Sequence, residues 1–431
     1  LDSADPQARF FVQRLVAAIK ALDARPVYYG TSLLQNDVCA DLVDIGGVNV
    51  PAKEAGDVGT LLEGWKRRHP DKPLFVLRYG KTVASGNRNG YSDPMSEEAQ
   101  ARFFLEHHRV LRAAGVTGSF YQAFADWRGD RPIITVEQND RYLHPVGMVG
   151  YAREKRLAFD VFRQLLADQR VAALPIGKKR SNFPVVHILA GFVVIFLVAY
   201  QFHYNRRFNE TFRRALLRSY NFFADLRDVH SVSTLHSLIV AFAVSLTAGT
   251  LLSALLHHYR TDVFVDYLLT QVVVLDALKE ELIGAVWNPL AGVIAFSVGF
   301  FLLSLLGMLV VRLAALFVRR RVSLFHAYTA MVWGALPVVF LSPLAMSLFK
   351  LLANPFYVVP SFVLLLVAAV WVFLRILKGV SVVFDVRRLH IHIAGFLLAG
   401  GVLAGGIAWL DLQYGLLSYL RFIVHLFENI G

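Results

Sequence analysis

Six apolar segments follow residue 183, and polar or charged loops separate them. Each segment has about 20 residues, the length that an α-helix rising ~1.5 Å per residue needs to cross ~30 Å of hydrocarbon. We therefore predict an all-α, polytopic membrane domain of about six transmembrane helices. The predicted spans are 184–203, 232–256, 290–311, 327–349, 356–377 and 391–410.

Three further segments of this half are apolar on one side only. Residues 204–230 alternate Arg with Phe and Leu, which predicts a basic amphipathic helix in the membrane interface. Residues 263–278 are too short to span and contain Asp266 and Asp276, so a re-entrant or surface helix is expected. Residues 413–431 form an amphipathic C-terminal tail.

The pattern before residue 170 is different, because short apolar runs alternate there with amphipathic helical segments. Such alternation predicts parallel βα units and an α/β fold. Four units make half of an eight-stranded TIM barrel. The predicted strands lie in PVYYGTS, DLVDIGGVNV, PLFVLRYG and GSFYQAFAD, and the predicted helices at 6–24, 57–69, 95–114 and 151–169. Residues 171–183 then form a linker.

Charge in the loops predicts the orientation of the membrane domain. The net charge is +12, and three basic loops (204–230, 319–325 and 378–390) fall on one side if the spans alternate. That side is cytoplasmic by the positive-inside rule, and the acid-rich loop 257–289 lies opposite. The N-terminal domain and the C-terminus are then outside the cytoplasm. Lys178, Lys179 and Arg180 stand against this orientation.

Composition excludes several functional classes. The soluble half has no basic stripe interleaved with aromatic residues, so nucleic-acid binding is not expected. The single cysteine, Cys39, rules out an internal disulfide and reads as a core residue. The histidine pairs lack further ligands at metal spacing, so we assign no metal and no cofactor. These pairs are His107/His108, His257/His258 and His390/His392.

The soluble half resembles glycoside hydrolase family two, the β-galactosidase and β-glucuronidase family. The resemblance covers about 8–168 and depends on the order of RPVYYGTS, DIGGVNV, KPLFVLRYGK, MSEEAQARFF, GSFYQAFADWRGDRP and GMVGYAREKRLAFDVFR. It implies strands five to eight of the catalytic (β/α)8 barrel with its closing helix. It also implies a retaining pair of glutamates ~5 Å apart, with the nucleophile at the end of strand seven and the acid/base on strand four.

This chain departs from the family where the nucleophile belongs. The strand reads Leu77-Arg78-Tyr79-Gly80, so Arg78 stands in the nucleophile position. An arginine is cationic at every relevant pH and cannot form a glycosyl ester. The acid/base cannot be assessed, because strand four would lie upstream of Leu1. Val50 follows Asn49 where a Tyr is usual, and Tyr121-Gln122 replaces a Trp-rich pair, whereas Phe124 to Trp127 match well.

No catalytic residue is assigned, and Asp126 is the candidate for a displaced nucleophile because it follows a strand end. Glu137 and Asp140 occupy a later loop and read as ordinary loop acids. Arg78 either binds an anionic group, such as a uronate or phosphate, or fills the old site in a buried ion pair. The predicted glycan or partner pocket contains Asn49, Arg78, Tyr79, Tyr121, Gln122, Asp126 and Trp127.

The membrane half is similar to Yip-type and related bacterial five-span domains over about 205–412, of which 231–412 holds the five spans. The resemblance rests on RRALLRSYNFFADLRD followed by five spans, and it implies architecture without a chemistry. No charge falls at mid-bilayer, so an ion-coupled transporter is poorly supported. The last span is rich in glycine, which favours close helix packing, within the chain or with a partner.

Taken together, these observations predict a membrane-anchored, catalytically degenerate glycosidase-like protein of a bacterial inner membrane, with its barrel in the periplasm. It would act as an accessory or scaffold subunit whose partners are the lipid bilayer, a carbohydrate ligand, and a membrane protein complex or a second copy. The alternatives are an active retaining glycosidase with a displaced nucleophile, and a membrane assembly factor or transporter-like protein. The chain begins with Leu1 and has no signal peptide, so we expect the other four barrel units upstream or, failing that, in another subunit.

Overall fold

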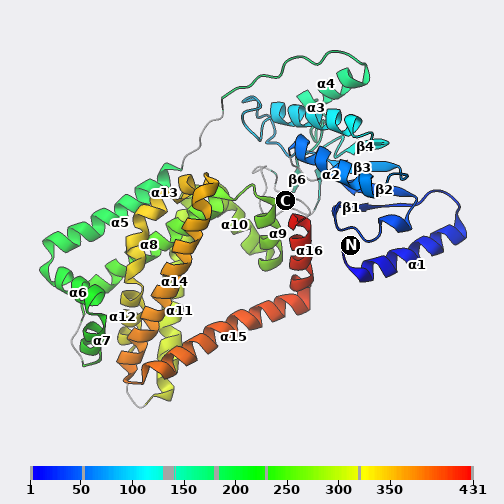
Figure 1. The fold of residues 1–431 in the computed structure, drawn as a ribbon. Coiled ribbons are helices and arrows are strands. Elements are labelled where there is room, and N and C mark those ends of the chain that lie inside the picture. The colour runs from blue at the N-terminus through cyan, green and yellow to red at the C-terminus, as the bar shows by residue number, and fades with distance from the viewer. Residues whose placement is uncertain are drawn as a thin grey trace. The chain divides into compact units, whose positions relative to one another are not determined.

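A computed structural model describes residues 3–50, 54–129, 140, 142–178, 184–228, 232–318 and 322–428. Glu137, the pair Lys179/Arg180 and the arginines at 319–321 lie outside these residues. The chain divides into two units, which Figure 1 shows as ribbons. One contains Leu1–Ser181 with Tyr414–Gly431, and the other contains Asn182–Gln413.

The first unit contains a four-stranded sheet in the order β1-β2-β3-β4. All neighbouring strands are parallel, and Gly47, Phe75 and Gly118 lie side by side across the sheet. The predicted α/β character and four strands are therefore confirmed. The strands are β1 Tyr28–Thr31, β2 Ile45–Asn49, β3 Leu74–Tyr79 and β4 Gly118–Tyr121.

Helices connect the strands and cover one face of the sheet. They are α1 Pro6–Leu22, α2 Ala55–Arg68, α3 Glu97–Ala113 and α4 Leu157–Leu166, with a short 3₁₀ helix at Ala40–Leu42. Trp65 of α2 packs directly on Gly46, where a Cβ would lie 2.3 Å from the indole. Leu74 and Val76 point to the same side and join Phe104 of α3 in one core cluster. This face is the hydrophobic core of the unit.

The opposite face of the sheet keeps its aromatic residues exposed. Tyr28 is 57% exposed and Phe120 58%, and the Phe120 ring stacks on Phe75. This is the face that would look into a closed barrel, because it alternates with the helix-covered face along each strand. A short antiparallel pair follows β4, formed by β5 Trp127–Arg128 and β6 Leu143–His144.

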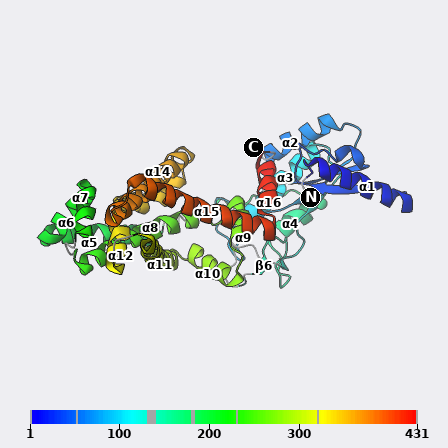
Figure 2. The same ribbon diagram turned by 90° about the horizontal axis from the view of Figure 1, so that it is seen from below.

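Among its described residues, the second unit contains six helical segments that are long and apolar enough to cross a bilayer, in agreement with the predicted spans. Figure 2 shows the helices from a second direction. Four are single helices: α5 Val185–Tyr204, α8 Thr234–His258, α14 Pro355–Phe384 and α15 Arg388–Tyr414. The third span, α11 Pro289–Ala314, runs on into the 3₁₀ turn Ala315–Phe317. Bilayer association is thus suggested by length and composition.

The fourth span is broken in the middle. It consists of α12 Leu324–Gly334, the 3₁₀ segment η3 Leu336–Leu341, and α13 Ser342–Leu352. Pro337 and Pro343 begin the second and third pieces, because proline lacks the N–H that a continuous helix needs. The Ser342 hydroxyl lies 3.1 Å from the Thr247 hydroxyl of α8.

The basic amphipathic segment forms α6 Arg206–Leu217 and α7 Ser219–Arg227. Its Phe208 and Phe212 are buried in the core of the helical bundle, together with Trp333. The apolar face of α6 therefore packs on protein, and the position of this segment in the membrane interface stays a prediction. Arg375 of α14 holds the end of α6 by donating hydrogen bonds to the carbonyls of Ala215 and Leu216.

Three further helices complete the description. The expected surface segment forms α9 Val263–Val272, and α10 Asp276–Trp287 follows it. The C-terminal tail is helical in α16 Leu416–Glu428, where Leu416 and Ile423 are buried. Within the glycine-rich α15 none of the described residues is buried, and Gly400 to Gly406 have open space around them.

Candidate functional site

Two of the predicted pocket residues lie side by side at the carboxyl ends of their strands. Asn49 ends β2 and pairs in register with Arg78 of β3, where an irregularity in β3 shifts the pairing by one residue. Leu77 contacts the positions of Gly30 and Gly47, so this end of the sheet face is lined by glycines. The Asn49 amide donates to Ser32 at 3.5 Å. Arg78 is exposed.

Within the described residues, no carboxylate lies within ion-pair distance of Arg78. Its backbone carbonyl accepts a hydrogen bond from Val50 at 2.8 Å, which fixes the strand end. The guanidinium is thus held on the open face of the sheet with its donors available. The exposure of Arg78 favours the anion-binding alternative over the buried ion pair, and the role of Arg78 stays a prediction.

Tyr79 and Tyr121 point to the other face, which corrects their assignment to the pocket. Tyr79 is 2% exposed in the core cluster. Its ring packs edge-on against Tyr121 with centroids 5.4 Å apart and lies parallel to Phe104. Burial raises the pKa of Tyr79 to about 12. Both tyrosines are therefore core residues; the one-residue irregularity in β3 turns Tyr79 inward.

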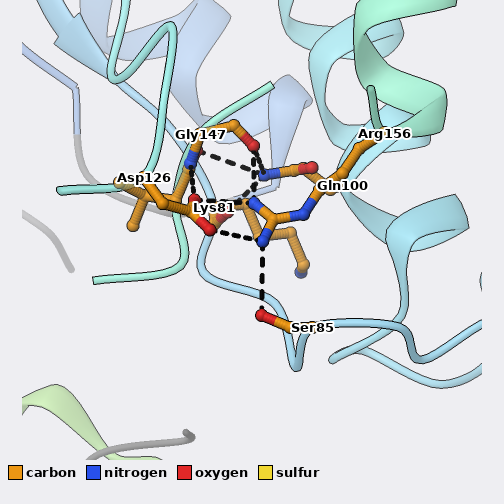
Figure 3. Close-up of polar contacts among 7 residues, drawn as sticks. Lys81, Ser85, Gln100, Asp126, Gly147 and Arg156 are labelled. Atoms are coloured by element: carbon orange, nitrogen blue, oxygen red, sulfur yellow. Dashed lines mark hydrogen bonds and ion pairs between the residues drawn. The ribbon is translucent and has the colours of Figure 1, made fainter. Parts of the chain in front are cut away.

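Asp126, the candidate for a displaced nucleophile, forms a buried bidentate ion pair with Arg156 (Figure 3). Arg156 Nη1 and Nη2 donate to the two carboxylate oxygens at 2.7 and 2.6 Å. The Gly147 N–H donates to Asp126 Oδ1 at 2.8 Å. The Asp126 side chain is 1% exposed and that of Arg156 is 2%. A nucleophile needs an oxygen directed at substrate, and both oxygens here are directed at protein donors.

Gln100 ties the loops around this ion pair together. Its side-chain amide donates to the carbonyls of Lys81, Val146 and Gly147 at 3.1–3.2 Å (Figure 3). Arg156 Nη1 also donates to the Gly147 carbonyl, at 2.8 Å. Neither Gln100 nor Arg156 was identified from the sequence. Arg156 lies 30 positions after its partner, and no local spacing signals such a pair.

The remaining predicted residues lie near the surface. Gln122 donates its N–H to the Tyr79 carbonyl at 2.8 Å, so it continues β4 beside β3. Trp127 is 40% exposed and stacks on His144 with centroids 3.8 Å apart. Asp140 pairs with Arg128, which agrees with the prediction of a loop acid. Among the described residues, no group of three His, Cys, Asp or Glu side chains could hold a metal ion.

Comparison with known proteins gives a partial relationship. About a third of the chain is weakly homologous to a β-glucuronidase of Streptococcus agalactiae serotype V. The two are 29% identical over 153 residues, which cover 32% of this chain and 25% of the relative. No protein-family model matches the chain, so the Yip-type resemblance stays a prediction.

Two solved structures also match part of the chain. A GH2 β-galacturonidase from Eisenbergiella tayi, bound to galacturonate, is 22% identical with a TM-score of 0.34, covering 39% of this chain and 32% of its own. A Ruminococcus gnavus β-glucuronidase in complex with uronic isofagomine is 20% identical with a TM-score of 0.34, covering 38% and 30%. This chain therefore spans about a quarter of the curated relative and about a third of these structures.

Proposed function

We propose that this chain is a membrane-anchored, catalytically degenerate glycosidase-like protein that binds carbohydrate without cleaving it. It would serve as an accessory or scaffold subunit of a membrane assembly. The sequence relationship to a β-glucuronidase supports the carbohydrate class. The proposal depends most on Arg78, which stands at the strand end where the family resemblance puts the nucleophile.

The surroundings of Arg78 favour binding of an anionic sugar. A guanidinium offers a planar pair of N–H donors that matches a carboxylate. Asn49 lies beside it and adds an amide that can donate and accept. The exposed rings of Tyr28 and Phe120 lie on the same face and provide apolar area for a sugar ring. A uronate fits this combination better than a neutral sugar.

Hydrolysis is disfavoured by charge and by geometry. Retaining cleavage requires two carboxyl groups ~5–5.5 Å apart, one of them an unprotonated nucleophile open to the substrate. Arg78 would oppose the positive charge that develops on the sugar in the transition state. The Asp126 carboxylate is directed at Arg156 and Gly147 instead. Asp126, the described candidate for a displaced nucleophile, is therefore not available to a substrate.

The six apolar segments support anchoring in a bilayer. From the loop charges we infer a bacterial inner membrane, with the sheet-bearing unit and the C-terminus on the periplasmic side. A carbohydrate-binding unit on that side would meet envelope or imported glycans.

The test measures the binding of glucuronate and galacturonate to the purified full chain by ligand-observed NMR. Glucose is the neutral reference. We expect uronate binding that R78A weakens about tenfold or more, since a charged hydrogen bond contributes about 1.5–3 kcal/mol. R67A is the matched control, because Arg67 is an exposed arginine on α2. Hydrolysis of an aryl β-glucuronide that survives repurification would overturn the proposal. Uronate binding that is equal in wild type and R78A would overturn the role of Arg78.

A further inference from the structure

One end of the helical bundle brings together the last turn of α8 and the junction between α10 and α11. His257 of α8 donates from Nδ1 to the Val286 carbonyl of α10 at 2.9 Å. Arg260 follows α8 by two residues, and Trp287 is the last residue of α10. The two side chains meet, with the Arg260 guanidinium 5.3 Å from the centroid of the Trp287 ring.

Two hydrogen-bond donors in this contact have no acceptor among the described residues. Arg260 Nη1 donates to the His257 carbonyl at 2.5 Å. However, Arg260 Nε and Trp287 Nε1 are both buried and make no hydrogen bond. Buried donors without partners are rare, and each costs about 1–3 kcal/mol unless a water, an ion or a ligand supplies the acceptor.

The charge of Arg260 is also uncompensated. Within the described residues, no carboxylate lies within ion-pair distance of it, and the nearby Asp262 accepts from the Val265 N–H to cap α9. Burial lowers the pKa of Arg260, but an arginine remains charged at physiological pH. Arg260 is partly buried, its Nε is fully buried, and a cation in such a position is costly without a counter-charge, so an anion is the acceptor that best fits this position.

We propose that Arg260 and Trp287 bind a phosphate group, carried by an anionic phospholipid of the adjoining leaflet. The proposal rests on the membrane insertion proposed above. Phosphate oxygens accept from arginine in the fork geometry that Arg260 presents, and the indole N–H supplies a second donor. Both residues lie at the end of a span, the depth at which phosphates and tryptophan side chains are found.

The neighbouring surface favours a lipid over a free anion. Leu290, Ile294 and Val298 lie at the start of α11 with four-residue spacing, and each is more than half exposed. They therefore form an apolar stripe that begins three residues after Trp287 and runs along the span. Acyl chains would lie on this stripe while the phosphate occupies the donors. A free phosphate would leave the stripe without a partner.

The experiment compares the purified full chain in nanodiscs of phosphatidylcholine alone and with phosphatidylglycerol added. Native mass spectrometry counts the retained phosphatidylglycerol, and thermal unfolding gives the accompanying stabilisation. We expect R260Q to bind the anionic lipid at least about tenfold more weakly. W287F, which keeps an aromatic ring and loses the N–H, should be intermediate. R206Q is the control, since the Arg206 side chain is 92% exposed and pairs with Glu210.

Three results would overturn the proposal. Equal retention by wild type, R260Q and W287F would exclude the site. Equal stabilisation by inorganic phosphate, with no preference between the two nanodiscs, would identify a free-anion site instead of a lipid site. Release of the unreconstituted chain from native membranes by alkaline carbonate would show that the chain is not inserted in the bilayer. That result would contradict the membrane insertion on which both proposals depend. Since R260Q leaves Arg78 untouched, its outcome does not test carbohydrate binding.

Discussion

The Asp126–Arg156 pair is bound by the backbone of Gly147 and by the side chain of Ser85. Both side chains are buried, and the Gly147 N–H and carbonyl bind one partner each. Both carboxylate oxygens of Asp126 and both Nη atoms of Arg156 have hydrogen-bond partners, so the buried charges of the pair are compensated within the protein. Removal of one member would leave the other charged in a site closed to water.

We therefore predict that D126N destabilises the sheet-bearing unit by about 3–5 kcal/mol. The measurement is the temperature at which this unit becomes sensitive to protease in the purified full chain. D160N is the control, because Asp160 forms an exposed pair with Arg163 and its loss should cost about 0–1 kcal/mol. The double variant D126N/R156Q should lose less than the sum of the single changes. Wild-type stability in D126N would contradict the structural role of this carboxylate.

The helices α6 and α7 depend on a contact from a distant span. Their aromatic residues enter the bundle core, and Arg375 caps the carbonyls at the end of α6. The last carbonyls of a helix have no partner within it, and an arginine is well suited to bind them. Lys378, one turn further along α14, donates to the Ser219 hydroxyl at 2.9 Å, where α7 begins. The pair α6 and α7, here called the α6–α7 hairpin, is thus held by Arg375 and Lys378 of α14.

We predict that R375Q loosens this hairpin and makes it a protease target. Trypsin should cut after Arg213, Arg214 or Arg218 about tenfold faster in the detergent-solubilised variant, because hydrogen bonds from a charged group contribute about 1.5–3 kcal/mol. Cleavage sites are identified by mass spectrometry of the fragments. K350Q serves as the control, since Lys350 is exposed on α13. An unchanged cleavage rate would mean that burial of Phe208 and Phe212 is sufficient to hold the hairpin.

Elements with a strong period could be predicted from the sequence, whereas contacts between distant elements could not. The four strands and the six spans follow from alternation and from apolar length, and both agree with the structure. The break in the fourth span is signalled only by Pro337 and Pro343, which also occur in kinked continuous helices. The inward turn of Tyr79 depends on an extra residue in β3, which no local pattern marks. In the site, Arg78 and Asn49 could be chosen because each ends a strand, but Arg156 could not.

At the scale of the whole molecule, the two units differ in what surrounds them. The sheet-bearing unit has a core of its own on one side of the sheet. The helical unit has long apolar faces open to its surroundings, as a protein in lipid requires.

Cys39, in the first unit, is fully buried, and burial raises the pKa of its thiol to about 11. The native chain should therefore be inert to thiol reagents while folded.

That inertness allows a direct test of the proposed orientation. In intact cells whose outer membrane is permeabilised, a membrane-impermeant maleimide should label D276C, because the Asp276 side chain is 90% exposed in the acid-rich loop. R387C, in the basic loop after α14, should react only when the inner membrane is also opened. The unsubstituted chain is the control and should stay unlabelled. The reverse pattern would place the sheet-bearing unit in the cytoplasm and remove the periplasmic assignment.

The broken fourth span affects how the chain is made. Its two half-helices have 11 residues each, about half the length that a span requires. The 3₁₀ segment between them has backbone groups that lipid cannot satisfy. Its pieces pack against α8, and α13 also contacts α5. Both partners leave the ribosome first. In the proposed membrane-anchored protein, the surface that receives the fourth span would therefore already be in the membrane when that span arrives. Thr247 contacts Ser342, which lies 95 residues later in the chain. A substitution of Thr247 would therefore impair the insertion of the fourth span.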